Sequence, residues 1–184
     1  MQTAILLSQS TFFTNLQLQI AQTLKMAANT RELARKLHTA VLINNLDEAS
    51  KLLDSGVVDV NVEYAFRSIK QTPLHVAATA GNILMVKFLL ENNANIKEAD
   101  DHGRTPLHRA AVAGSKEVVQ LLIDSGADLD AIDTEGQTPL YLAASSRKME
   151  VSKVLIECGA DINKADQHGL TPARWLQGVL KLMK

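Results

Sequence analysis

A short motif that returns at a fixed interval is the strongest constraint on how this chain folds. Thr72–His75 reads TPLH, and it returns at steps of 33 residues as Thr105–His108 (TPLH), Thr138–Tyr141 (TPLY) and the divergent Thr171–Arg174 (TPAR). A period of this length indicates an array of stacked repeats. Each repeat in such an array contacts only its neighbours, which leaves one long face free. We therefore expect the function on that face rather than in a buried pocket.

Each motif is predicted to begin a helix. Proline suits the first helical position because its ring fixes φ and its missing N–H would have no partner inside the helix. Paired alanines follow each motif, and their small side chains let neighbouring units approach closely, since larger ones would overpack the interface. These pairs are Ala77-Ala78, Ala110-Ala111 and Ala143-Ala144. We interpret them as packing residues rather than catalytic residues.

A second helix in each repeat is predicted from an apolar stripe with helical spacing. One such stripe consists of Val118, Val119, Leu121 and Leu122. The residue that ends each second helix is of a type that tolerates the left-handed conformation of a C-terminal cap. These residues are Gly56, Asn93, Gly126 and Gly159. Arg147 stands where Gly81 and Gly114 make the turn between two helices, so we expect this turn to differ.

With this period and the TPLHxAA core, each unit resembles an ankyrin repeat, which is a β-turn followed by two antiparallel helices. The resemblance covers about residues 36–184. It predicts an all-α ankyrin repeat solenoid of stacked helix-turn-helix units with short β-turn or hairpin connections, plus an N-terminal helical extension. It also implies a non-catalytic binding scaffold without cofactor or metal.

The expected organisation is an extension followed by one repeat domain. Residues 1–28 form the extension, which we expect to be partly helical or disordered. Asn29 and Glu32 have the spacing of a helix N-terminal capping pair, so the repeat domain is predicted to begin at residue 29. Its parts are a degenerate capping repeat with a long connection (29–71), three regular repeats (72–104, 105–137 and 138–170) and a truncated C-terminal cap (171–184). In that cap, Trp175 and Leu180 are predicted to seal the last apolar edge.

Apolar residues of the extension fall on one helical face. They are Phe13, Leu16, Ile20 and Leu24. This face suits either packing against the first repeat, which we favour, or docking on a partner. Met26 is an alternative start of the protein, and the sequence leaves that choice open.

The resemblance implies a partner-binding surface at the turn tips and on the exposed side of each first helix, along the concave face. The matching tip residues are Asp101, His102, Arg104, Thr134, Glu135, Gln137, Gln167, His168 and Leu170. The matching residues of the first helices are Thr79, Ala80, Val112, Ala113, Ser145 and Ser146. These positions differ between units while the scaffold repeats, as expected for a partner-specific surface on a generic scaffold. Unconstrained drift of surface residues is the alternative.

The connection before the first regular repeat carries four extra residues and is rich in aromatic and basic side chains. Tyr64, Phe66 and Ile69 stand close to Arg67 and Lys70. An exposed aromatic and basic loop is a surface that anchors partners. In the alternative interpretation, the aromatic side chains fold back and cover the edge of the first unit.

Composition and charge exclude several classes of function. The formal net charge of −1 leaves no basic excess for nucleic acid, and no apolar run is long enough for a membrane span. A single cysteine, Cys158, suits a reducing compartment, so we expect an intracellular protein, cytoplasmic or nuclear. We also expect the protein to be a monomer. An acidic run predicts a protein partner with basic character. This run consists of Asp124, Asp128, Asp130, Asp133 and Glu135.

The sequence holds no catalytic signature. His102, Glu135 and His168 occupy equivalent tips, but stacked helices lie roughly 8–10 Å apart, whereas zinc needs its ligands about 2 Å from one centre. His75 and His108 are interpreted as hydrogen-bonding residues between neighbouring turns. No phosphate-binding loop or nucleophile elbow is present.

Two functions remain. The first is a protein-binding adaptor or a regulatory or inhibitory subunit that holds its partner on the concave face. The alternative is a structural spacer or targeting subunit attached through the extension. In addition, Asn61 and Asn163 lie in leucine-spaced contexts that resemble the sites modified by asparaginyl hydroxylases in ankyrin repeats, while a turn preference of asparagine explains them equally.

Overall fold

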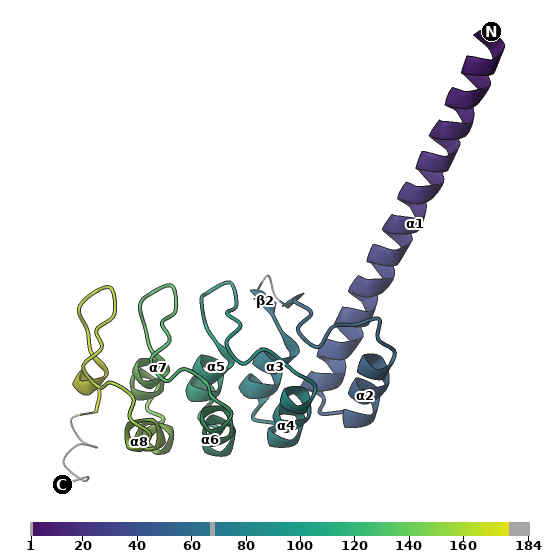
Figure 1. Cartoon of the computed structure of the whole chain (residues 1–184). Helices are drawn as coiled ribbons and strands as arrows, with labels where there is room; N and C mark the ends of the chain where they lie inside the picture. Colours follow the sequence, from purple (N-terminus) through teal and green to yellow (C-terminus); the bar gives the residue numbers. More distant parts are fainter. Residues whose placement is uncertain (1, 67–68, 177–184) are drawn as a thin grey trace.

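The computed structural model describes residues 2–66 and 69–176 and shows a row of stacked helix pairs from which one long helix projects (Figure 1). The elements in chain order are α1 (Gln2–Leu42), α2 (Leu46–Asp54), β1 (Tyr64–Phe66), β2 (Ile69–Gln71), α3 (Pro73–Ala80), α4 (Ile83–Glu91), α5 (Pro106–Ala113), α6 (Lys116–Asp124), α7 (Pro139–Ser145), α8 (Met149–Glu157) and a 3-10 turn, η1 (Pro172–Arg174). The predicted all-α repeat solenoid is confirmed.

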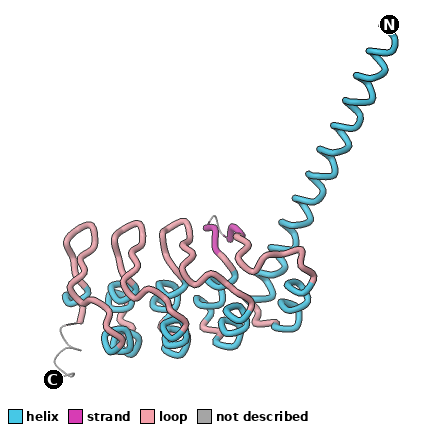
Figure 2. The backbone as a smooth tube through the Cα atoms, viewed as in Figure 1, coloured by secondary structure: helices cyan, strands magenta, loops and turns pink. Residues whose placement is uncertain are grey.

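The array has three ranks. The first helices α3, α5 and α7 pack on one another, and α1 packs on α3 at one end. The second helices α4, α6 and α8 form a parallel rank beside them, and the loops between units form a third rank that stands above the helices (Figure 2). The long connection forms an antiparallel hairpin of β1 and β2, with Tyr64 opposite Gln71.

The Thr-Pro motifs begin the first helices, as predicted. Thr72 and Thr105 are extended N-cap residues, and a proline follows each. The Nε2 of His75 lies 2.8 Å from the carbonyl oxygen of Arg104, so this nitrogen carries the proton and donates. Its Nδ1 then accepts from the backbone N–H of Thr72 at 3.3 Å. His108 repeats this geometry one unit later, which confirms that these histidines join neighbouring turns.

The core is a ladder of equivalent side chains. One leucine in the first helix of each unit has no exposed surface, and the paired alanines are at most 1% exposed. The leucines are Leu37, Leu74, Leu107 and Leu140. This burial confirms that the alanine pairs are packing residues, because a larger side chain there would force the first helices apart.

The expected helix start at Asn29 is wrong. Helix α1 runs without a break from Gln2 to Leu42, across the predicted boundary at residues 28 and 29. The reason is that Lys36 stands where later units have proline, so nothing in this segment stops a helix. Met26 is 72% exposed, and Ala34 is the first buried residue among the side chains of α1 that the structure describes. The side chains of the apolar stripe at residues 13–24 lie outside the described part of the chain.

The second helices end as predicted. Gly56, Asn93, Gly126 and Gly159 all have positive φ. Arg147 does not reshape its turn, since its φ of 59° is in the same region as the 72° of Gly81. The only difference is that α7 ends one residue earlier than α3 and α5, at Ser145.

The prediction that Trp175 seals the apolar edge at the C-terminal end is wrong. This side chain is 43% exposed, whereas the next residue, Leu176, is fully buried. The register explains the difference: Leu176 takes the position of the first buried alanine, Ala143, and Trp175 takes the position of Leu142 on the first-helix face. Leu180 lies outside the described residues.

The loops are built around one buried aspartate per unit, which the sequence analysis did not identify. Asp100, Asp133 and Asp166 are at most 8% exposed. The carboxylate of Asp133 accepts the backbone N–H groups of Glu135 and Gln137, both at 2.9 Å, and the other two aspartates do the same in their loops. Neighbouring loops are joined by backbone bonds, such as the one from the N–H of Thr134 to the carbonyl of His102 at 2.9 Å. The tips therefore form a regular row.

Candidate partner-binding face

The candidate site is the face formed by the outer side of the first helices and the loops above them, which we call the concave face. Equivalent residues line it in rows. The first row is Thr39, Val76, Arg109, Leu142 and Trp175, and the second row is Leu42, Thr79, Val112 and Ser145. A third row is Ile43, Ala80, Ala113 and Ser146.

The concave face changes from apolar to polar along the array. Leu42 is 52% exposed and Ile43 is 65% exposed at the N-terminal end, and Val112 is 36% exposed two units later. The next unit has Ser145 and Ser146 in these rows. In the second and third rows, exposed apolar side chains therefore gather over the first three units, while the exposed Trp175 lies in the first row at the far end.

The predicted partner-binding residues differ in how accessible the structure leaves them. Those that are exposed are Asp101, His102, Val112, Thr134, Glu135, Ser146, Gln167 and His168. Those that are partly buried are Tyr64, Arg104, Ala113, Gln137 and Ser145. Arg67 and the side chain of Phe66 lie outside the described residues. The exposed tips fall in one row, so they can all meet one extended partner.

Two arginines of the face form ion pairs with buried aspartates. The Nε of Arg104 lies 3.1 Å from a carboxylate oxygen of Asp133, which is 1% exposed, and Arg109 bonds Asp100. Burial works against ionisation of Asp100, but Arg109 and two backbone N–H groups outweigh it and lower its pKa. Both arginines are thus neutralised by the scaffold.

The predicted acidic run therefore needs a correction. Asp133 is buried and paired with Arg104, so it is not available to a partner. Asp124 is exposed at the C-terminal end of α6, Asp128 is exposed in the loop that follows it, and Glu135 is exposed at the tip. The acidic character that a partner meets at the tips comes from Asp101 and Glu135.

The hairpin of β1 and β2 holds its aromatic residue against α1. The rings of Tyr64 and His38 have centroids 5.3 Å apart and are tilted by 47°. Tyr64 thus folds back onto the first unit, in agreement with the alternative interpretation of this segment. The Nε2 of His38 lies 2.7 Å from the carbonyl oxygen of Gln71, which ties the hairpin to α1.

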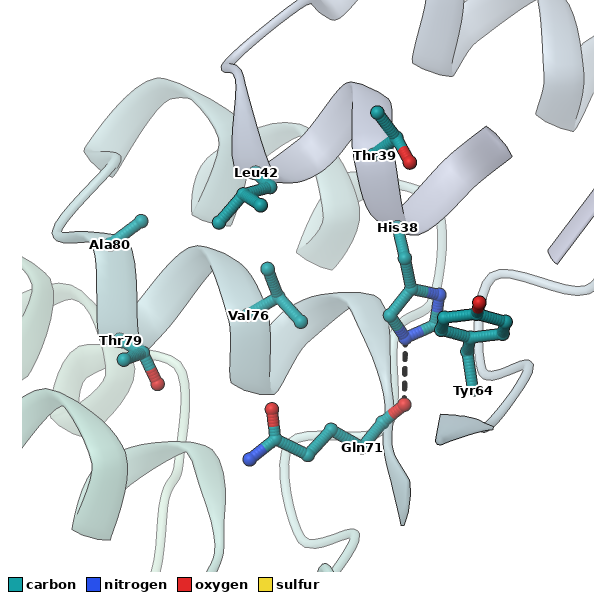
Figure 3. A pocket seen from close by; sticks show the side chains of 8 residues that line it. All are labelled: His38, Thr39, Leu42, Tyr64, Gln71, Val76, Thr79 and Ala80. Carbon is teal, nitrogen blue, oxygen red and sulfur yellow. Dashed lines mark hydrogen bonds between the residues drawn. The ribbon is translucent and has the colours of Figure 1, made fainter. Parts of the chain in front are cut away.

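A pocket of about 190 Å³ opens at the N-terminal end of the concave face (Figure 3). Its lining residues are His38, Thr39, Leu42, Tyr64, Gln71, Val76, Thr79 and Ala80. Figure 3 shows His38 and Tyr64 at one end, Thr79 and Ala80 at the other, and Leu42 and Val76 between them. The sequence analysis missed this pocket because it assigned no function to the first unit's row. Alignment of Leu42 with Thr79 and Val112 is the signal that could have found it.

Other candidate sites are placed as follows. In residues 2–66 and 69–176, no group of three histidine, cysteine or acidic side chains is arranged to hold a metal ion. Asn61 is partly buried, and its side-chain oxygen accepts the backbone N–H of Asn95 at 2.6 Å. Asn163 is exposed. Hydroxylation of both asparagines stays a prediction.

The sequence matches known repeats over most of this architecture. Residues 37–133 match a model of three ankyrin repeat copies, and residues 135–167 match a single ankyrin repeat. The first match alone spans more than half of the chain, so the protein belongs to the ankyrin repeat family. No curated protein is significantly similar to the chain. In the described residues, no helix combines the length and the apolar character that crossing a membrane requires.

Ankyrin repeats are protein–protein interaction modules, and the family typically consists of non-catalytic scaffolds. This general role agrees with the geometry, because in the described residues the buried histidines and aspartates are bonded to the chain's own backbone, threonines and arginines.

Proposed function

We propose that this protein is a non-catalytic adaptor or regulatory subunit that holds a protein partner along the concave face. The observation that carries the proposal is the contrast between two sets of residues. The histidines, alanines and aspartates that repeat are buried in the scaffold, while the residues that vary, such as Leu42, Val112 and Trp175, are exposed in rows on one face. Exposed aromatic and aliphatic side chains in a row suit a protein partner.

The partner is expected to have basic character beside its apolar residues. Arg104 and Arg109 are paired with buried aspartates, whereas Asp101 and Glu135 are exposed at the tips. Exposed charges steer association and are screened by salt. We therefore propose a partner whose association slows as salt is added, bound by a monomeric protein inside the cell.

The test is affinity capture with two variants that change the charge equally. The concave variant combines Val112→Arg, Glu135→Lys and His168→Ala, and the control variant combines Glu117→Lys with Asp124→Asn on α6. Each captured protein is then purified and titrated directly against the wild type and both variants. We expect a partner that binds the wild type and the control but loses at least about tenfold in affinity for the concave variant, which corresponds to about 1.4 kcal/mol.

Two outcomes would contradict the proposal. One is a partner whose affinity falls equally for both variants, and the other is a partner that binds the concave variant unchanged. Circular dichroism of all three proteins checks that the array stays folded.

The projecting part of α1 favours one alternative, a spacer or targeting subunit. Helix α1 extends well beyond the array, and residues 25–32 are exposed (Figure 1). Deletion of residues 2–28 separates the two functions. The scaffold proposal expects direct binding of the partner to be unchanged, whereas the alternative expects it to be lost.

A further inference from the structure

Strand pairing and a hydrogen bond hold together the elements that form the pocket at the N-terminal end of the concave face. Tyr64 and Gln71 face each other across the hairpin, and the hairpin is held to α1 by the bond from His38 to the carbonyl oxygen of Gln71. His38 is 5% exposed and lies against the Tyr64 ring. A site whose walls are already fixed loses little conformational entropy when it binds.

The lining of the pocket is uncharged. Thr39 and Thr79 donate their hydroxyl protons to carbonyl oxygens of their own helices, at 2.8 Å in both cases. Burial lowers the pKa of His38, and its two backbone hydrogen bonds only partly offset this, so the ring is neutral near pH 7. The remaining walls are the apolar side chains of Leu42, Val76 and Ala80, the ring of Tyr64 and the side chain of Gln71. Such a lining disfavours a charged group and favours an apolar one.

The side-chain amide of Gln71 has spare hydrogen-bonding capacity, as does the hydroxyl of Tyr64. Within the described part of the chain, the side-chain amide of Gln71 makes no hydrogen bond, and Figure 3 shows it extending along the wall below Val76. An amide offers both donors and an acceptor, which matches the N–H and C=O of a peptide group. The pocket thus combines an apolar cavity with a partner for a polypeptide backbone.

The size of the pocket matches one side chain. A cavity of 150 Å³ in another protein binds benzene, so about 190 Å³ accommodates a branched aliphatic chain or a single ring. The pocket is also part of the rows of the concave face, since Val76 lies in the first row and Leu42 in the second.

We propose that this pocket anchors one apolar side chain, between leucine and phenylalanine in size, from a protein partner whose backbone bonds the amide of Gln71. The partner segment then lies along the concave face, where Val112 continues the apolar row and Asp101 and Glu135 stand at the tips. This inference rests on the proposed function and adds the chemistry of the anchor.

The test uses defined probes on the full chain. N-acetyl-leucine-methylamide carries the side chain and two peptide groups, and N-acetyl-alanine-methylamide has the same backbone without the anchor. NMR of the labelled protein follows the methyl groups of Leu42 and Val76 and the side-chain amide of Gln71. We expect the leucine probe to shift all three signals with a Kd of roughly 1 mM, the affinity typical of so small a ligand, and the alanine probe to leave them unchanged.

A matched pair of variants locates the binding. Ala80→Phe fills the mouth of the pocket from an exposed position on α3, and Ala113→Phe makes the same change at the equivalent position of the next unit. We expect at least a tenfold loss of leucine-probe binding in the first variant and none in the second. Gln71→Glu removes the amide donors, and we expect it to weaken the probe without changing the fold.

Three results would overturn the inference. These are equal shifts with both probes, shifts that survive Ala80→Phe, and methyl shifts that depend on protein concentration alone, which would assign the pocket to a second copy of the chain. Failure of the proposed function has a different signature: the concave variant would then keep its captured partner, whatever the probes do.

Discussion

The first unit and the regular units of this array use the same core but begin their first helices differently. Leu37 in the first unit and Leu107 in a regular unit are both fully buried. Helix α5 nevertheless starts at Pro106, whereas α1 continues N-terminally for more than thirty residues beyond the equivalent Lys36. This difference shows that the core leucine determines the packing, whereas the Thr-Pro pair determines where the helix begins.

The histidine that follows shows the same contrast. In the regular unit, Nδ1 of His108 faces the backbone N–H of Thr105, at 3.1 Å. In the first unit, Nδ1 of His38 lies 3.1 Å from the carbonyl oxygen of Ala34, because the continuous helix places a carbonyl there instead of an N-cap. Both histidines still reach the next loop through Nε2.

The largest expected effect comes from truncating the equivalent leucines. Leu107→Ala removes a fully buried side chain between two neighbouring units and should lower the free energy of unfolding by about 2–5 kcal/mol. Leu37→Ala creates a similar cavity at the end of the array, where a unit has one neighbour and can unfold separately.

The single tryptophan, Trp175, distinguishes the two results because it reports on the far end. For Leu107→Ala we expect fluorescence and circular dichroism to shift together. For Leu37→Ala we expect circular dichroism to show an early loss of helix, without a change in tryptophan fluorescence at the same denaturant concentration. Coincident transitions in both variants would show that the first unit is no less coupled than the others.

The next effect follows from introducing into α1 the Thr-Pro pair that begins the first helix of each regular unit. Arg35→Thr with Lys36→Pro places the regular motif in α1, and an interior proline costs a helix about 3 kcal/mol. We expect lower helicity from the segment before residue 35 and an array whose main unfolding transition is unchanged. Lys36→Ala is the control, since it removes the charge and keeps the helix. Unchanged helicity in the double variant would contradict the role given to proline.

The sequence predicted the regular units well because each local signal there acts within a few residues. Proline starts the first helix, the alanines pack it, and residues such as Gly126 and Asn93 end the second. The start of α1 was not predictable from the Asn29 signal, since a capping pair does not by itself terminate a preceding helix.

The site was harder to predict than the fold. The pocket joins α1, the hairpin and α3, and the extra residues of the long connection shift the register between Leu42 and Thr79. Trp175 was predicted to seal the last apolar edge, but the register places it on the concave face. Position relative to the repeat decides exposure here more than residue type does.

A smaller effect compares an interior loop with the terminal one. Gly103 and Gly169 have φ of 71° and 76°, so alanine costs each about 1–2 kcal/mol of backbone strain. A Cβ on Gly103 would also lie 2.9 Å from the backbone nitrogen of Thr134 in the next loop, whereas one on Gly169 meets nothing within 4 Å. We expect Gly103→Ala to cost about 1–3 kcal/mol more than Gly169→Ala in urea unfolding. Equal costs would mean that the loop row is not tightly stacked.

The smallest expected effect is the pH dependence of the three histidines. Burial lowers the pKa of His38, His75 and His108 below the ordinary value of 6.5, and backbone hydrogen bonds offset this only in part. The folded state thus binds fewer protons than the unfolded state near pH 6. The contribution of each neutral ring to stability is complete above about pH 6.5 and is lost as the pH falls toward the folded-state pKa.

The first unit should differ from the others in the order of protonation. A protonated His38 gains a donor toward the carbonyl of Ala34. A protonated His75 instead loses the bond that its Nδ1 accepts from the backbone N–H of Thr72, and only the Thr72 hydroxyl oxygen, 2.8 Å away, can accept from the new N–H. We therefore expect His38 to take up its proton at a higher pH than His75 and His108, as measured from imidazole nitrogen shifts in NMR. If His75 or His108 protonates first, the carbonyl of Ala34 is not the feature that distinguishes the two kinds of unit. The variant His75→Gln measures how much one histidine contributes to the loss of stability at low pH. It should reduce that loss and leave the titration of His38 unchanged.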